Sequence, residues 1–194
     1  MPPIVGNVQP VAELLTRAFH DDPPPVWWYP DPVERDEQML AFWRAMATAG
    51  LAAGDGLMSE DGNGVALYVP PGKAVDESLV ETSGLPAVID GMGPEQASRI
   101  GAFFEVLDRL QAEAIQEPHW ELHCIGVDPA SQGRGLGVAL VDEMTLRARR
   151  DGVPGFLLTA AEWNVSFYER RGYRIVQQAA VPDSPLQAWA MRLD

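Results

Sequence analysis

The sequence contains very little cysteine and lysine. Of its 194 residues only Cys124 is a cysteine, so no disulfide can form within the chain, and a reducing compartment such as the cytoplasm is expected. Lys73 is the only lysine, and the formal net charge is −14. Because nucleic-acid binders need a basic face for phosphate contacts, this balance excludes a general nucleic-acid partner.

Long apolar runs are missing as well. No stretch approaches the roughly 18 to 20 apolar residues of a membrane-spanning helix, so no membrane partner is expected. The first residues lack the basic and apolar segments of a signal peptide. The chain has no repeats and no low-complexity linker, and 46% of its residues are hydrophobic, enough for a packed core. We therefore predict one domain over residues 1–194.

Hydrophobic periodicity and capping residues predict an α/β (α+β) fold whose mixed sheet is flanked by helices. Residues 20–30 interrupt the first helix and are expected to form a Pro-rich loop. The expected helices begin after Asn7 and after Asp31, occupy most of 73–117, and cover about 134–150 and 163–171. The expected strands are 56–60, 65–69, 119–127, 156–159, 173–180 and 186–192.

The most informative segment is a glycine loop between a strand and a helix. Gly133, Gly135 and Gly137 lack a Cβ, so the backbone can adopt positive φ and a ligand can approach closely. The first amides of the following helix have no intrahelical partner, and the helix dipole makes that end favourable for anions. These features predict a pyrophosphate site. The Gly-x-Gly-x-Gly spacing fits neither a Rossmann fingerprint nor a P-loop, which needs Gly-Lys-Ser/Thr.

A second motif, Asn164-Val-Ser-Phe-Tyr-Glu-Arg-Arg-Gly-Tyr173, follows at a fixed separation. With it, the chain resembles the GCN5-related N-acetyltransferase (GNAT) superfamily, and within it the puromycin N-acetyltransferase-like branch. The segment 132–137 is similar to the family's acetyl-CoA loop, Q/R-x-x-G-x-G/A. The likeness is strong over 117–194 and thinner over 7–116. It implies a central, mostly antiparallel sheet. The family's first strand is expected to be reduced or absent here, because residues 2–5 are too short to form it.

The resemblance implies acetyl-CoA as co-substrate, with no metal. The pantetheine arm is expected on the strand backbone and at Asn164, which could also simply cap its helix. Tyr168 is the expected general acid for the departing thiolate and also contacts the co-substrate. Arg134 is expected to add a charge-assisted contact to the pyrophosphate. The full predicted co-substrate site is Ile125, Gly126, Val127, Gln132, Gly133, Arg134, Gly135, Leu136, Gly137, Val138, Asn164 and Tyr168.

The general base has two candidates. Strand alternation predicts Glu121, His123 and Ile125 on one face and Cys124 on the other. Glu121 matches by position the strand glutamate of histone-type members, and His123 has a suitable intrinsic pKa. Cys124, on the opposite face, is expected to be an inert core residue, which favours direct transfer over an acyl-enzyme.

The acceptor site is expected in the segment after the first helix. Trp27, Trp28, Tyr29 and Asp22, with the neighbouring His20 and Asp21, could bind a cationic or ring-bearing amine; alternatively, the aromatic residues fold onto the core. The predicted function is acetyl-CoA-dependent N-acetylation of a small-molecule amine, by direct attack in a ternary complex. The alternatives are a non-catalytic acyl-CoA-binding sensor or interaction module, and a protein or peptide N-acetyltransferase. A homodimer could form through an exposed sheet edge.

Overall fold

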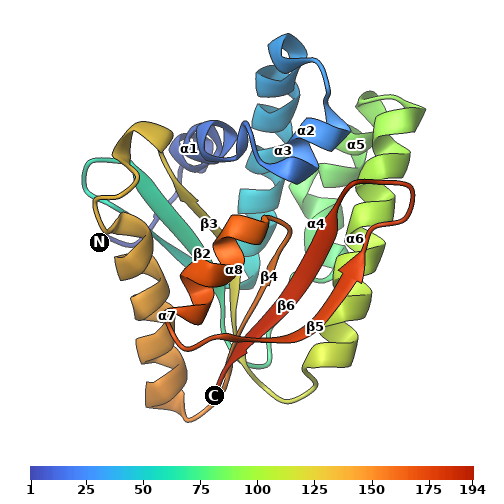
Figure 1. Ribbon diagram of the computed structural model, residues 1–194. Coiled ribbons are helices and arrows are strands. Elements are labelled where there is room, and N and C mark those ends of the chain that lie inside the picture. The colour runs from blue at the N-terminus through green and yellow to red at the C-terminus, as the bar shows by residue number, and fades with distance from the viewer.

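The computed structural model describes residues 1–194, and a six-stranded sheet forms its centre (Figure 1). The strand order is β1-β2-β3-β4-β6-β5. Only β3 and β4 are parallel neighbours; every other pair is antiparallel. The strands are β1 (Asp55–Met58), β2 (Gly64–Val69), β3 (Trp120–Val127), β4 (Gly155–Thr159), β5 (Arg174–Ala180) and β6 (Gln187–Leu193).

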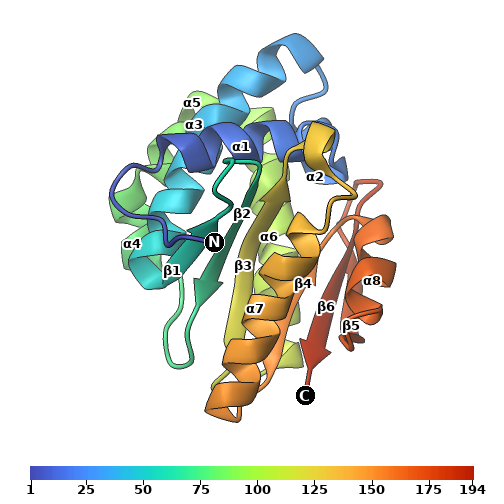
Figure 2. The ribbon, with the colours of Figure 1, turned by 90° about the vertical axis from the view of Figure 1, so that its left-hand side faces the viewer.

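Helices cover both faces of the sheet (Figures 1 and 2). One core packs α7 and α8 against the sheet, with Leu140 and Met144 beside Tyr68. The other core lies under α1, α3 and α6, with Phe42 and Ile100 at its centre. The helices are α1 (Gln9–Phe19), α2 (Pro23–Trp28), α3 (Pro32–Ala53), α4 (Glu77–Ser83), α5 (Leu85–Gly91), α6 (Pro94–Ala114), α7 (Leu136–Asp151) and α8 (Glu162–Glu169). This arrangement confirms the predicted fold class. No helix combines the length and apolar character needed to cross a membrane.

The expected first strand is reduced to a single bridge. Pro3 pairs with Leu57 of β1, and the Ile4 amide donates to Gly56 O at 2.9 Å. Pro2 and Pro3 have no N–H groups, so this segment cannot extend a regular ladder. The sheet therefore begins in practice with β1.

Three local predictions were wrong. Residues 23–28 form the short helix α2 instead of a loop, because proline fits the first helical turn, where an amide has no partner. Helix α7 begins at Leu136, so Arg134 precedes it. Helix α8 begins at Glu162 with Ala161 as its N-cap, so Asn164 lies inside the first turn and does not cap the helix.

A bulge in β3 changes which side chains share a face. Leu67 of β2 pairs with Cys124, whereas the next residue, Tyr68, pairs with Leu122, so His123 is the extra residue. Cys124 consequently packs on the side of α3 and α6, and Ile125 packs on the side of α7. The predicted alternation holds for Glu121 and His123, which contact each other, but was wrong from Cys124 onward, because one inserted residue reverses every later position.

The two parallel strands diverge after a short contact. β3 pairs with β4 over Trp120–Leu122 only, opposite Gly155–Leu157. Beyond this point the backbone of residues 125–127 still pairs with β2 but not with β4. The divergence leaves peptide groups free on one edge of β3, in the middle of the sheet.

Candidate active site

A cavity of about 520 Å³ opens where β3 and β4 diverge. The end of β3, the glycine loop, the start of α7 and one face of α8 form its walls. Eleven of the twelve residues predicted to hold the co-substrate border it: Ile125, Gly126, Val127, Gln132, Gly133, Gly135, Leu136, Gly137, Val138, Asn164 and Tyr168. The sequence motifs thus converge on one place.

The glycine loop presents a run of unpaired amides. The backbone N–H groups of residues 133–138 donate no hydrogen bond within the protein. Gly133 and Gly135 adopt φ of 75° and 86°, a region that side chains disfavour, and a Cβ at either position would meet nothing within 4 Å. These amides lie at the N-terminus of α7, where the helix dipole adds positive potential. The loop is therefore suited to bind phosphate oxygens.

The cation at this cavity is Arg171, which sequence reasoning missed. Arg134 is exposed and does not border the cavity, whereas Arg171 does. The Arg171 guanidinium lies 3.7 Å from the Phe167 ring centroid, and its Nε is buried without a hydrogen-bond partner. Helical spacing could have indicated this residue, because Arg171 follows Phe167 by four residues at the C-terminal end of α8 and so lies on the same side of the helix.

A second cavity, of about 150 Å³, adjoins the first. Tyr168, Asp22, Asn164, Ile125 and Phe19 border both cavities. The rest of its wall is mainly apolar and comes from five separate elements: Trp28 of α2, Phe42, Trp43 and Met46 of α3, Phe103, Phe104 and Leu107 of α6, and residues of β3 and β4. The residues shared by the two cavities are placed where two bound molecules would meet.

Tyr168 is a buried phenol at this meeting point, with 4% of its surface exposed. Burial is the main cause that raises the pKa of its hydroxyl above the ordinary value, and the nearby Tyr173, Cys124 and Asp22 raise it further. The hydroxyl therefore stays protonated at neutral pH and can act as a hydrogen-bond donor. Burial likewise raises the pKa of Cys124, which keeps that side chain a neutral thiol.

Asp22 is an acid in an apolar setting. Its side chain makes no hydrogen bond or ion pair, and burial, followed by the charge of Asp21, raises its pKa to about 6. Its charge also raises the pKa of Tyr168 and of Cys124, which places the carboxyl in their vicinity. A carboxylate without a partner at the junction of two cavities is available to a cationic ligand.

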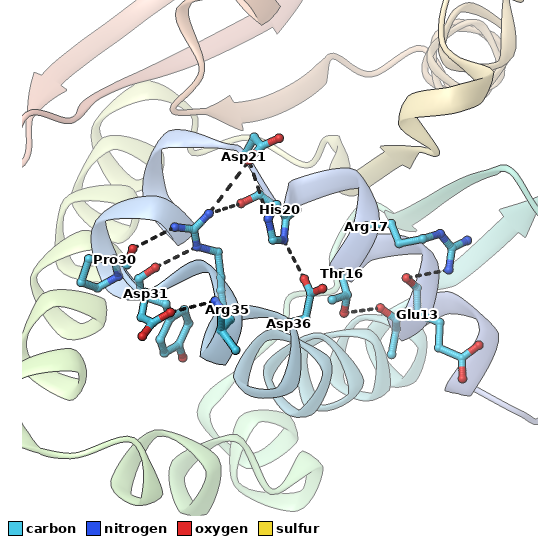
Figure 3. A network of polar contacts seen from close by, with 12 residues as sticks. Glu13, Thr16, Arg17, His20, Asp21, Pro30, Asp31, Arg35 and Asp36 are labelled. Carbon is cyan, nitrogen blue, oxygen red and sulfur yellow. Dashed lines mark hydrogen bonds and ion pairs between the residues drawn. The ribbon is translucent and has the colours of Figure 1, made fainter.

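A buried arginine fixes the segment that carries Asp22. The guanidinium of Arg35 donates to His20 O at 3.0 Å, to Tyr29 O at 2.8 Å and to Pro30 O at 3.3 Å (Figure 3). These three carbonyls lie before and after α2. Nearby, His20 Nδ1 lies 2.6 Å from Asp36 Oδ1. Arg35 therefore holds the two ends of the α2 segment together on α3.

The predicted aromatic acceptor residues have different positions. Trp28 borders the second cavity and stacks with Phe104 at a centroid distance of 6.2 Å. Trp27 lies outside it under Arg99, and Tyr29 is buried, its hydroxyl donating to Met92 Sδ. His20 and Asp21 belong to the polar contacts around Arg35 (Figure 3). Of the six residues predicted for the acceptor site, only Trp28 and Asp22 border either of the two cavities.

Glu121 and His123 form a closed pair. His123 Nδ1 lies 3.1 Å from Glu121 Oε1, and Gln111 donates to Glu121 Oε2 at 3.2 Å. Burial alone would raise the pKa of Glu121, but these hydrogen bonds outweigh it and lower that pKa. Glu121 borders neither cavity. His123 borders the second, but its Nε2 is buried without a partner and its ring packs against Gly50 of α3.

Comparison with known proteins agrees with this geometry. Residues 99–173 match the sequence model of the Acetyltransferase (GNAT) family. A 68-residue stretch is 37% identical to the mycothiol acetyltransferase of Propionibacterium freudenreichii, covering 34% of this chain but only 22% of that relative. No group of three or more potential metal ligands is present in the structure.

Solved structures share the fold over nearly the whole chain. One is the histone acetyltransferase HPA2 and related acetyltransferase from Corynebacterium glutamicum, with a TM-score of 0.66, 21% identity, and 98% and 93% of the two chains covered. Another is arylalkylamine N-acetyltransferase 2 from Aedes aegypti, with a TM-score of 0.59, 16% identity, and 98% and 96% covered. An agmatine N-acetyltransferase has a TM-score of 0.58 at 15% identity, with 99% and 97% covered.

Residues 99–173 are therefore similar to the GNAT family of acetyltransferases, as the glycine loop and the α8 motif predict. The whole chain shares its fold with the solved acetyltransferases named above.

Proposed function

We propose that the protein is an acetyl-CoA-dependent N-acetyltransferase that acts on a small-molecule amine by direct attack in a ternary complex. The observation that carries the proposal is the row of six unpaired amides on a cavity that meets a second cavity at Tyr168. The names of the similar proteins support acetyl transfer. Proteins of this fold are named for an arylalkylamine and for agmatine, so the fold alone does not select the amine.

The residues of the first cavity fit acetyl-CoA, which when bound supplies an acyl group activated as a thioester. The amides of residues 133–138 would bind the pyrophosphate oxygens, with Arg171 as the nearby cation. The free edge of β3 at residues 125–127 offers peptide groups to the amides of the pantetheine arm. Bound in this way, the thioester end would lie towards Tyr168.

Two side chains at the junction are suited to the proton transfers. The amine must lose a proton before its nitrogen attacks the acyl carbon, and we assign that proton to Asp22, whose carboxylate has no other partner. As the carbon–sulfur bond breaks, Tyr168 donates its hydroxyl proton to the leaving sulfur, and the second proton lost by the nitrogen restores the Tyr168 hydroxyl. The Glu121–His123 pair remains a second candidate for the base, but its free nitrogen is closed off from both cavities.

The second cavity favours a small acceptor over a protein. Its volume of about 150 Å³ is that of a compact molecule, and its walls are side chains from α2, α3 and α6. A non-catalytic acyl-CoA sensor would need the first cavity only. The presence of a phenol and an unpartnered carboxylate between the two cavities therefore favours catalysis.

The test combines binding and turnover. Acetyl-CoA should raise the melting temperature, and thiol release should follow when an amine is added. Gly135→Val, which forces a β-branched side chain to φ of 86°, should abolish the thermal shift, whereas Gly101→Ala on the exposed face of α6 should keep it. A thermal shift without thiol release across a broad amine panel would support the sensor instead. No shift in the wild type would overturn both.

A further inference from the structure

Among the residues that line the second cavity, Asp22 is the only acid and His123 the only basic residue, and Asp22 also borders the first cavity. The Nε2 atom of His123 is sealed, so Asp22 alone offers a charge to a ligand. The remaining wall is mainly apolar and strongly aromatic, with Trp28, Phe42, Trp43, Met46, Phe103, Phe104 and Leu107.

The size of the cavity matches one ring. A cavity of about 150 Å³ with apolar walls binds benzene in another protein, and the volume here is about 150 Å³. The aromatic side chains already contact one another, with Trp28 5.2 Å from Phe103 and 5.4 Å from Phe42 between ring centroids. An aromatic ligand could join this cluster in the same edge-to-face or stacked geometries.

A second positive charge on the ligand would have no partner in this wall. Buried charges without a partner are strongly disfavoured, because the lost hydration is not replaced. The cavity therefore discriminates against diamines and guanidino amines, and favours an amine whose other end is apolar.

From this distribution we infer that the acceptor is a primary amine carried on a single aromatic ring or an apolar group of that size. Its ammonium group would lie at Asp22, and its ring would lie among the lining residues of α2, α3 and α6. The inference rests on the proposed function, and it adds the chemical class of the acceptor.

The first experiment compares amines that differ in one property. With acetyl-CoA, 2-phenylethylamine and n-hexylamine should each have a kcat/KM at least about tenfold above that of 1,6-diaminohexane, which differs from n-hexylamine only by the second charge. A diamine or agmatine used equally well or better would overturn the inference and leave the acetyltransferase assignment intact. No thiol release with any amine, despite acetyl-CoA binding, would instead overturn the proposed function.

The second experiment changes the cavity itself. Leu107→Ala should enlarge it and shift the preference towards 2-(1-naphthyl)ethylamine, and Leu107→Trp should fill it and lower kcat/KM for 2-phenylethylamine about tenfold or more. The matched control is Leu146→Trp, on the exposed face of α7, which should change neither value. The acetyl-CoA thermal shift should be the same in all three variants. An unchanged ring preference in Leu107→Ala would overturn the inference, even if Leu107→Trp fails to fold.

Discussion

The two cavities differ in the chemical groups that they offer to a ligand. The first draws mainly on backbone, from β3 through the glycine loop into α7, with α8 close behind in sequence. The second is made of side chains from α1, α2, α3 and α6 together with β3 and β4. A backbone site tolerates changes of side chain but depends on a few glycines, whereas a side-chain site can change its ligand by single substitutions. If the proposed function is right, one half of the molecule sets the donor and the other half sets the acceptor.

The largest expected effect on kcat is at Tyr168, which lies between the two cavities. Tyr168→Phe should lower kcat about 100-fold or more, because the leaving sulfur loses its hydrogen-bond donor. The KM for acetyl-CoA should change little, since the amides of the loop remain. Steady-state thiol release measures both values. A kcat equal to that of the wild type would show that Tyr168 is not the general acid.

Asp22→Asn should separate activity from stability. We expect kcat/KM for the amine to fall about tenfold or more, and the acidic limb of its pH profile, with a pKa of about 6, to disappear. Asp90→Asn, an exposed aspartate on α5, is the control and should leave the profile unchanged.

The same variant should be more stable than the wild type at neutral pH. The folded state raises the pKa of Asp22 from 3.8 to about 6, so its ionisation destabilises the fold as the pH rises through that window. Removing the charge should increase the free energy of unfolding by about 2 kcal/mol above pH 7 and by nothing below about pH 4. Urea unfolding at several pH values tests this, and a destabilised variant at pH 7.5 would argue against a strained carboxylate.

Arg35→Met tests the acceptor half alone. Three carbonyls lose a charged donor, so the free energy of unfolding should fall by about 3 kcal/mol. The KM for the amine should rise, while the acetyl-CoA thermal shift persists. Arg44→Met, at an exposed position of the same helix, is the matched control. Equal loss of acetyl-CoA binding would mean that the two halves are not independent.

The smallest effect is expected at the closed pair. Glu121→Gln keeps the shape of the side chain and should lower kcat less than about threefold if Asp22 takes the proton. A 100-fold lower kcat would instead show that the Glu121–His123 pair acts as the general base. The result therefore decides which half of the molecule supplies the base.

The sequence predicted most of the first cavity because the determinants of that cavity are local. Gly133, Gly135 and Tyr168 act through spacing along one stretch of chain, and all three lie where the motifs predict. The bulge at His123 was not predictable from β3 alone, since it depends on the pairing with β2. Arg171 was missed because its role follows from how α8 lies against the loop. In the acceptor half, only Asp22 and Trp28 of the predicted residues border the cavity, because tertiary packing decides which side of α2 faces inward.

Arg35 binds carbonyl oxygens, which every amino acid supplies, and it makes no hydrogen bond or ion pair with a side chain of α2. Residues 23–28 can therefore mutate without loosening their attachment to α3, provided that the short helix persists. Such a segment can change the shape of the second cavity while the rest of the protein stays the same. Under the proposed function, the anchor would make new amine specificities accessible to evolution, and to directed libraries, through changes in one six-residue helix.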